Sequence, residues 1–183
     1  MTYQFDLSPA NKPGYDINQV NAFIALARQQ FNDQSGQLLS SNQVRQVEFD
    51  LVHGGYDIKS VDGAIERLED AFVAREISRE RQIIGTTQID LRFVNLKNLL
   101  EGRLGRPKNK KFSRAAWPLR GYNRKQVDAL CASLSAGLNG GANFEVKQAR
   151  NAIFKASRGG YVEGQVDAFI DRAVEYLQLQ NHR

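Results

Sequence analysis

One motif occurs four times in this chain. Each copy is a Gly-Tyr pair with a Val six residues after the Gly. The copies are Gly14-Tyr15 with Val20, Gly55-Tyr56 with Val61, Gly121-Tyr122 with Val127, and Gly160-Tyr161 with Val166. A catalytic site is usually present once in a chain, whereas a repeated unit builds an architecture or a binding surface. The repeat therefore favours a scaffold or an adaptor, and we expect the chain not to be an enzyme.

Each Val begins the apolar stripe of an amphipathic helix. Counted from the Val, apolar residues fall at offsets of about 0, 3, 4, 7 and 11, which is the spacing of one helix face. Polar residues that can cap a helix precede three of the stripes, at Asp16, Asp57 and Asn123, whereas Val162 precedes the fourth. Strand patterns are nearly absent, so the sequence predicts an all-α protein. We expect each Gly to permit a bend and each Tyr to pack beneath it, with its hydroxyl on a polar partner.

A Phe before each Gly-Tyr pair divides the copies into two kinds. Phe5 and Phe112 precede their Gly by nine residues, and Phe49 and Phe154 precede theirs by six. Helix-like runs, at 42–48 and 145–153, precede only the even copies. The chain is thus predicted to be a duplicated helical repeat with two motif units per half, and the halves are expected to pack about a pseudo-twofold axis. Such a chain would be a monomer, or a homodimer through its central helix.

The predicted domains are residues 1–75 and 111–183, each with a pair of motifs, and a connector over 76–110. The second motif helix is expected to continue to Gly85. A further helical stripe follows Thr87 and ends before Gly105 and Pro107. The basic segment 105–114 after it is interpreted as a mobile linker.

Bulk composition narrows the class of protein. The chain has 183 residues, of which 42% are hydrophobic, and this is enough for one domain or two small ones with real cores. No stretch approaches the ~20 apolar residues of a membrane span, and the N-terminus lacks the pattern of a signal peptide. Cys131 is the only cysteine, which fits a reducing cytoplasm.

Positive charge is concentrated near the middle of the chain. Nine Lys and Arg and no Asp or Glu lie between Arg103 and Lys125, while the net charge of the whole chain is +5. An anionic membrane would attract such a belt, and Trp suits the headgroup region; the alternative is a solvated linker whose Trp packs into the second half. Nucleic-acid binding is disfavoured because no recognised module accompanies the belt. The candidate contact residues for a membrane or a partner are Arg106, Lys108, Lys110, Lys111, Arg114, Trp117, Leu119 and Arg120.

The residues that usually carry chemistry indicate no catalytic, metal or cofactor site. Cys131 lies on an apolar helix stripe and is interpreted as a core residue. His53 and His182 are too isolated to suggest a metal site or a triad. Gly54-Gly55 and Gly159-Gly160 are not followed by the Lys-Ser/Thr of a phosphate-binding loop.

The order of aromatic residue, spacer, Gly-Tyr, polar cap and Val-Asp/Asn resembles the DivIVA domain. The fourth copy, "AIFKASRGGYVEGQVDAFIDRAVEYL", and the second, "VEFDLVHGGYDIKSVDGAIERLEDAF", resemble it most. The first copy has Asn21 where the others have an Asp. The motif residues that carry the resemblance are Gly14, Tyr15, Val20, Gly55, Tyr56, Val61, Asp62, Gly121, Tyr122, Val127, Asp128, Gly160, Tyr161, Val166 and Asp167.

This resemblance implies a cytoplasmic adaptor or scaffold in bacterial cell division or envelope growth, membrane-associated at the septum or pole. In the family an aromatic-Arg pair before the Gly-Tyr touches the membrane. Of the corresponding pairs here, only Leu119-Arg120 keeps an apolar-basic character. No sustained heptad run follows the last motif, so the family's coiled-coil tail is missing. The expected partners are proteins of the division or growth machinery. The alternative function is binding to an anionic membrane surface, and the third is an uncharacterised enzyme activity.

Overall fold

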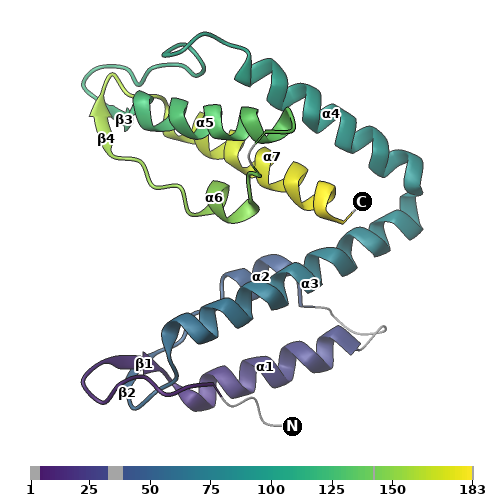
Figure 1. Ribbon diagram of the computed structural model, residues 1–183, viewed down its shortest axis with the longest axis vertical. Coiled ribbons are helices and arrows are strands. Elements are labelled where there is room, and N and C mark those ends of the chain that lie inside the picture. The colour runs from purple at the N-terminus through teal and green to yellow at the C-terminus, as the bar shows by residue number, and fades with distance from the viewer. Residues whose placement is uncertain (1–4, 33–38, 142, 183) are drawn as a thin grey trace. The chain divides into compact units, whose positions relative to one another are not determined.

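The computed structural model describes residues 5–32, 39–141 and 143–182. The chain divides into two compact units, residues 1–80 (unit 1) and residues 81–183 (unit 2). Each is mainly helical, as the sequence predicts, and Figure 1 gives the order of the elements. Among the described residues, no helix is long and apolar enough to cross a membrane.

Unit 1 contains two long helices and two very short strands. Its elements are β1 (Pro13–Tyr15), α1 (Ile17–Asn32), α2 (Ser41–Arg45), β2 (Leu51–His53) and α3 (Ile58–Ile84), of which α3 continues past the unit boundary. The two strands pair antiparallel, with Gly14 opposite Val52. Buried Val20, Ile24, Tyr56 and Val61 form the core next to the strands, so the core lies where the two motif helices begin.

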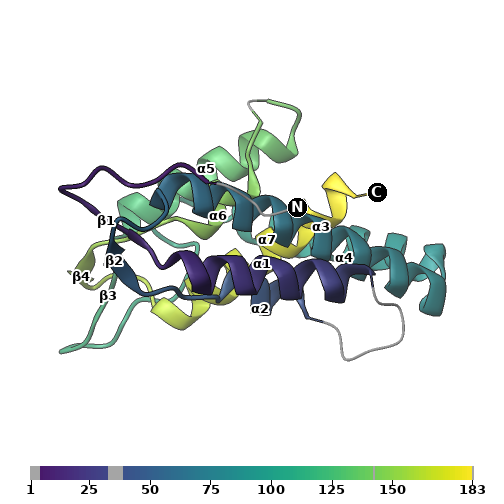
Figure 2. The same cartoon turned by 90° about the horizontal axis from the view of Figure 1, so that it is seen from below.

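Unit 2 repeats this succession and adds a helix before it. Its elements are α4 (Thr86–Leu104), β3 (Arg120–Tyr122), α5 (Arg124–Leu138), α6 (Val146–Arg150), β4 (Ala156–Arg158) and α7 (Glu163–Asn181). The strands β3 and β4 pair antiparallel, with Gly121 opposite Ser157. Helix α4 packs on α7, where the rings of Phe93 and Tyr176 stack at 4.7 Å between centroids. Figure 2 shows β3 and β4 beside the start of α7.

The helices follow the predicted stripes closely. The four motif valines are at most 1% exposed. The other stripe residues are buried or half-buried except Phe31, which is 39% exposed and packs its ring against Phe72. The predicted caps at Asp16, Asp57 and Asn123 accept hydrogen bonds from backbone N–H groups of the first turn, whereas Val162 supplies no side-chain cap. Gly85, at φ 87°, separates α3 from α4 as predicted.

In the part of the chain that the structure describes, four very short strands accompany the predicted helices. Gly14-Tyr15 and Gly121-Tyr122 lie within β1 and β3, and Tyr56 and Tyr161 form isolated antiparallel bridges with the Tyr of those strands. A three-residue strand is too short to give the alternation of apolar and polar residues by which a strand is recognised. Pairing between distant segments, rather than local sequence preference, makes these residues extended.

Candidate functional site

The two motif copies of each unit meet through their backbones. In unit 2 the N–H of Tyr122 donates to the carbonyl oxygen of Tyr161 at 2.9 Å, and the N–H of Tyr161 donates to that of Tyr122 at 2.9 Å. Tyr15 and Tyr56 make the same exchange in unit 1, at 3.0 and 2.9 Å. The odd and even copies of a unit are therefore joined reciprocally, as partners in an antiparallel pair.

The glycines of the motif allow this close approach. A β-carbon on Gly121 would lie 2.1 Å from the carbonyl oxygen of Tyr161, and one on Gly160 would lie 2.3 Å from that of Gly121. In unit 1 the corresponding distances are 2.4 Å from a β-carbon on Gly14 to the carbonyl oxygen of Tyr56 and 2.7 Å from one on Gly55 to that of Gly14. These four glycines do not have positive φ, so the bend that the sequence suggested is not their role. In the even copies the positive φ belongs to the preceding residue, Gly54 or Gly159, at 73° and 62°.

The tyrosine hydroxyls cross to the helix of the other copy in the unit. The Tyr161 hydroxyl donates to Oδ1 of Asp128 at 2.9 Å. The Tyr56 hydroxyl lies 3.4 Å from Oδ1 of Asn21, at the equivalent place in unit 1. The residue after the motif Val is thus the acceptor for the partner copy's Tyr, which explains why a short Asp or Asn stands there.

The odd tyrosines make the reciprocal contacts. Tyr15 pairs with Asp62, and Tyr122 pairs with Asp167. Burial, followed by the negative charge and hydrogen bond of the carboxylate, raises the pKa of both hydroxyls above the ordinary value. All four tyrosines are therefore used in joining the copies.

The phenylalanines before the motifs cross in the same way. Phe112 packs edge-on against the ring of Tyr161 at 5.2 Å, and Phe5 packs against Tyr56 at 5.2 Å. Phe49 and Phe154 pack on the odd tyrosines, at 5.4 and 5.1 Å. Each ring pair joins one copy to the other, so the two Phe spacings reflect the two positions in a reciprocal pair.

A glutamine before the motif Val adds a third cross-connection. The side-chain oxygen of Gln19 accepts the N–H of Asp50 at 2.8 Å, and that of Gln126 accepts the N–H of Lys155 at 2.8 Å. Gln165 accepts from Ser113 at 2.9 Å. Gln19 and Gln126 lie three residues after Asp16 and Asn123, at the spacing of a capping box, but their side chains bind the loop of the other copy instead of the cap of their own helix.

The basic segment after α4 is packed rather than free. The Asn109 N–H donates to Oδ2 of Asp128 at 2.7 Å, and the Lys111 N–H donates to the Tyr161 hydroxyl at 3.2 Å. The Lys111 ammonium donates to the carbonyl oxygen of Arg106 at 2.9 Å, and Phe112 is 4% exposed. The segment interpreted as a mobile linker is thus attached to the motif core. Lys111, predicted as a contact residue, is half-buried and binds backbone carbonyls.

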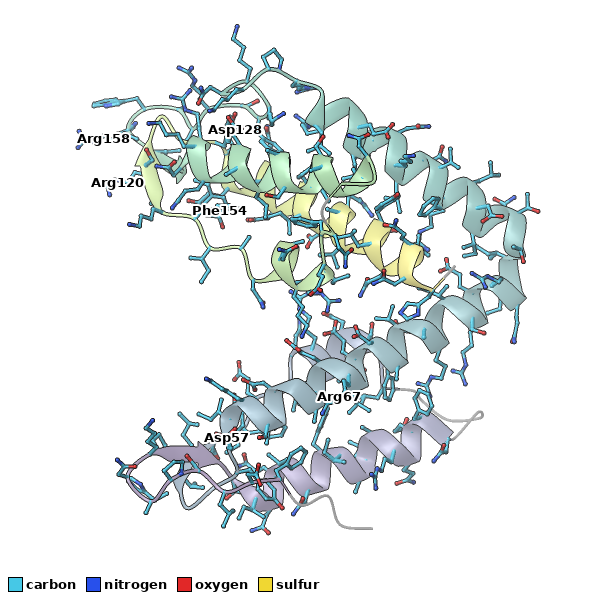
Figure 3. All side chains as sticks on the ribbon, in the orientation of Figure 1. Asp57, Arg67, Arg120, Asp128, Phe154 and Arg158 are labelled. Atoms are coloured by element: carbon cyan, nitrogen blue, oxygen red, sulfur yellow. The ribbon has the colours of Figure 1, made fainter. Side chains whose placement is uncertain are left out.

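The remaining predicted contact residues include an exposed group at the end of unit 2. We call this surface the unit 2 tip; Figure 3 shows two of its members, Arg120 and Arg158, beside the strands. Trp117 is 87% exposed, Leu119 is 65% exposed and Ile153 is 90% exposed. The basic members of the tip are also exposed; they are Arg114, Arg120, Lys155 and Arg158.

Two of these arginines lie directly opposite each other. Arg120 of β3 and Arg158 of β4 are register partners, which places their β-carbons about 4.5–5.5 Å apart. Like charges at such positions destabilise a strand pair, so an anionic group between them would relieve their repulsion. Sequence reasoning missed Arg158, Lys155 and Ile153 as members of this surface. They are distant in the chain, and the signal available was that Arg158, like Arg120, precedes a Gly-Tyr motif.

Unit 1 carries different chemistry at the same positions. Pro13 and His53 are the register partners in place of the two arginines, and Leu7 forms the bridge that Arg114 forms in unit 2. Backbone bonds from Asp16 to Asp50 and from Asn123 to Lys155, both 2.9 Å, give the further equivalence of Asp50 with Lys155. We call the exposed residues of this end the unit 1 tip; they include Asp6, Leu7, Lys12, Pro13, Glu48, Asp50, Leu51 and His53.

Other features of unit 2 are less suited to a site. Burial raises the pKa of the Cys131 thiol to about 11, which opposes a nucleophilic role. Leu91 and Leu99 of α4 help line an open groove of about 540 Å³ beside α7, crossed by the ion pair of Arg92 and Glu175. Within the described ranges, no group of three or more His, Cys, Asp or Glu residues is placed to hold a metal ion.

No protein-family model, curated protein or solved structure compared with the chain matches it. What the fold defines is a mainly helical protein whose motif copies join in reciprocal pairs. The likeness to the DivIVA domain is carried by the motif residues alone and stays a prediction.

Proposed function

We propose that this chain is a non-enzymatic, DivIVA-like adaptor or scaffold of bacterial cell division or envelope growth, acting by protein–protein interaction at the septum or pole. We also take the two units to be duplicates of a two-motif ancestor. Support for duplication comes from the matching order of strands and helices and from the same Tyr–Tyr exchange in each unit. The paired motifs then serve as a structural framework, and binding depends on the exposed side chains that this framework carries.

The observation that carries the proposal is the unit 2 tip. Exposed Trp117 and Leu119 lie in the segment that ends at Arg120, whose register partner is Arg158, and the counterpart in unit 1 lacks this combination. Trp and Arg are the residues that most often dominate the energy of a protein interface. Since the tyrosines and glycines of the motif are occupied in joining the copies, the tip is the surface left to select a partner.

Capture of partners from the native cell tests this proposal. The chain would be compared with Arg120→Glu/Arg158→Glu and with Lys108→Glu/Lys110→Glu, which reverses the same number of exposed charges outside the tip. We expect the first pair of substitutions to abolish capture of a division or growth protein and the second pair to preserve it. Equal capture by all three proteins would contradict the assignment of the tip.

The alternative function is binding to an anionic membrane surface through the belt Arg103–Lys125. The high exposure of Trp117 and Leu119 beside basic residues favours it. Because Trp117 is the only Trp in the chain, a blue shift of its fluorescence would report insertion directly. In this case anionic but not neutral vesicles should shift the emission and sediment the protein, and Arg114→Glu/Arg120→Glu should prevent both. Lys111 is unsuitable for the test because its ammonium binds backbone carbonyls.

A further inference from the structure

The two units differ strongly in charge. Residues 1–80 contain seven Lys and Arg against twelve Asp and Glu, a formal charge of −5. Residues 81–183 contain eighteen against eight, a formal charge of +10. The boundary between the units therefore also separates an acidic unit from a basic one. The positive charge of unit 2 is not confined to the basic belt.

The contrast in charge also appears at the tips, where one pair of equivalent positions carries opposite charges. Asp50 in unit 1 stands where unit 2 has Lys155, and the backbone bonds of both residues to the start of the neighbouring helix have the same length, 2.9 Å. Two residues earlier, Glu48 stands where unit 2 has Ile153. Asp6 adds a third exposed carboxylate to the unit 1 tip, against one ammonium at Lys12.

Both tips also expose apolar side chains next to their charges. Leu7 and Leu51 of the unit 1 tip are 61% and 58% exposed. Trp117 and Leu119 of the unit 2 tip are 87% and 65% exposed. An apolar patch with a charged rim is the usual composition of a protein interface, and here the rims have opposite sign.

We propose that the unit 1 tip of one chain binds the unit 2 tip of a second copy of the same chain. The contact joins different surfaces of the two molecules, so a bound pair keeps one free unit 1 tip and one free unit 2 tip and can add further molecules. Contacts of this heterologous type produce rings if the rotation closes and open chains if it does not. Opposite charges at the rim guide the association and make it sensitive to salt.

This inference rests on the proposed function, because it takes the unit 2 tip to be the binding surface and names one partner for it. A second copy is favoured over a bilayer by the unit 1 tip, whose three carboxylates an anionic membrane would repel.

Sedimentation velocity at several concentrations, in about 0.05 M and about 0.5 M salt, tests the proposal. Two variants each lose one tip: Asp6→Ser/Glu48→Ala loses acidic groups, and Arg120→Ala/Arg158→Ala loses basic ones. We expect the unaltered chain to show a mass that rises with concentration at low salt and falls at high salt. Each variant alone should remain a monomer, and their equimolar mixture should form a 1:1 dimer and nothing larger, since each supplies the tip that the other lacks.

Lys108→Ala/Lys110→Ala is the control, because it removes the same positive charge from unit 2 outside the tip. It should assemble as the unaltered chain does. A constant monomer mass for the unaltered chain, a monomeric mixture, or equal loss in the control would each overturn the proposal. Circular dichroism would establish that each variant is folded.

The outcome is separable from that of the proposed function. Asp6→Ser/Glu48→Ala leaves the unit 2 tip intact and should still capture a division or growth protein. If the unaltered chain stays monomeric while that capture persists, self-association fails and the adaptor function stands. If assembly occurs and no other protein is captured through the unit 2 tip, the adaptor function fails and self-association stands.

Discussion

Replacement of Gly160 by Ala tests whether close backbone approach is the reason for the motif glycine. The added β-carbon would lie 2.3 Å from the carbonyl oxygen of Gly121, 2.5 Å from its carbonyl carbon and 2.6 Å from the carbonyl oxygen of Tyr122. All three atoms belong to the backbone, so no side chain can rotate away. The backbone around Gly160 must instead move away from β3, which lengthens the two 2.9 Å hydrogen bonds between Tyr122 and Tyr161.

The expected cost has two parts. Forcing extra volume into a packed site costs about 1–3 kcal/mol, and weakening two backbone hydrogen bonds costs up to about 0.5–1.5 kcal/mol each. Together they give a loss of roughly 2–6 kcal/mol in the free energy of unfolding of unit 2. For a unit of this size, 1 kcal/mol corresponds to about 4–8 °C in Tm, so a decrease of about 10 °C or more is expected.

Differential scanning calorimetry is the assay, because it can resolve the transition of unit 2 from that of unit 1. Fluorescence is less suitable, since the single Trp is 87% exposed when folded. Gly164→Ala is the control: this glycine lies in the first turn of α7 with no atom within 4 Å of an added β-carbon, and Ala there should stabilise by up to about 1 kcal/mol. A Tm for Gly160→Ala equal to that of the unaltered chain would refute the role assigned to the glycine.

Three further predictions concern side chains of the motif and core. Tyr56→Ala and Tyr161→Ala should each cost about 3–5 kcal/mol in chemical denaturation, because the rings are 5% and 0% exposed; unchanged unfolding in both would contradict a core role. Burial and the Asp128 hydrogen bond raise the pKa of Tyr161 to about 12 from the ordinary 10.0, although the Lys111 N–H opposes the shift. The protonated hydroxyl is therefore favoured by folding, and its contribution should be complete below pH 10 and lost as the pH rises towards 12. Denaturation midpoints over this range should fall less steeply in Tyr161→Phe, and an equally steep fall would count against the assignment. The Cys131 thiol, 1% exposed, should react with a thiol reagent at least tenfold more slowly in the native protein than in denaturant, and equal rates would indicate an accessible cysteine.

Local sequence was sufficient to predict the helices. The stripe that begins at each motif Val is a property of one segment, and burial at Val20 or Val166 follows from its period alone. Caps such as Asp57 are equally local, because the acceptor and the donor at Ser60 are three residues apart. The boundary at Gly85 was predictable for the same reason.

The reciprocal joining of the copies could not be predicted in this way. Gly-Tyr followed by a polar cap resembles a turn before a helix, and nothing within one copy indicates that Tyr161 bonds to Tyr122 or that Gln126 binds the loop at Lys155. These contacts depend on which copies pair, and four copies allow several pairings. For the same reason the sequence did not indicate the unit 2 tip, since Arg120 and Arg158 become neighbours only when β3 and β4 pair.

The segments that precede the odd motifs, Leu7–Pro13 and Arg114–Arg120, have the same length and end in the same backbone pairing. The two motif copies of a unit contact each other through main-chain atoms and buried rings. The exposed side chains of these segments are therefore not needed for the pairing. We therefore expect residues 114–120, grafted in place of 7–13, to give unit 1 a basic surface with an exposed Trp while the buried contacts of its core are kept. In such an arrangement the exposed side chains of one unit can change, and with them the partner it binds, while the buried contacts of both units stay the same.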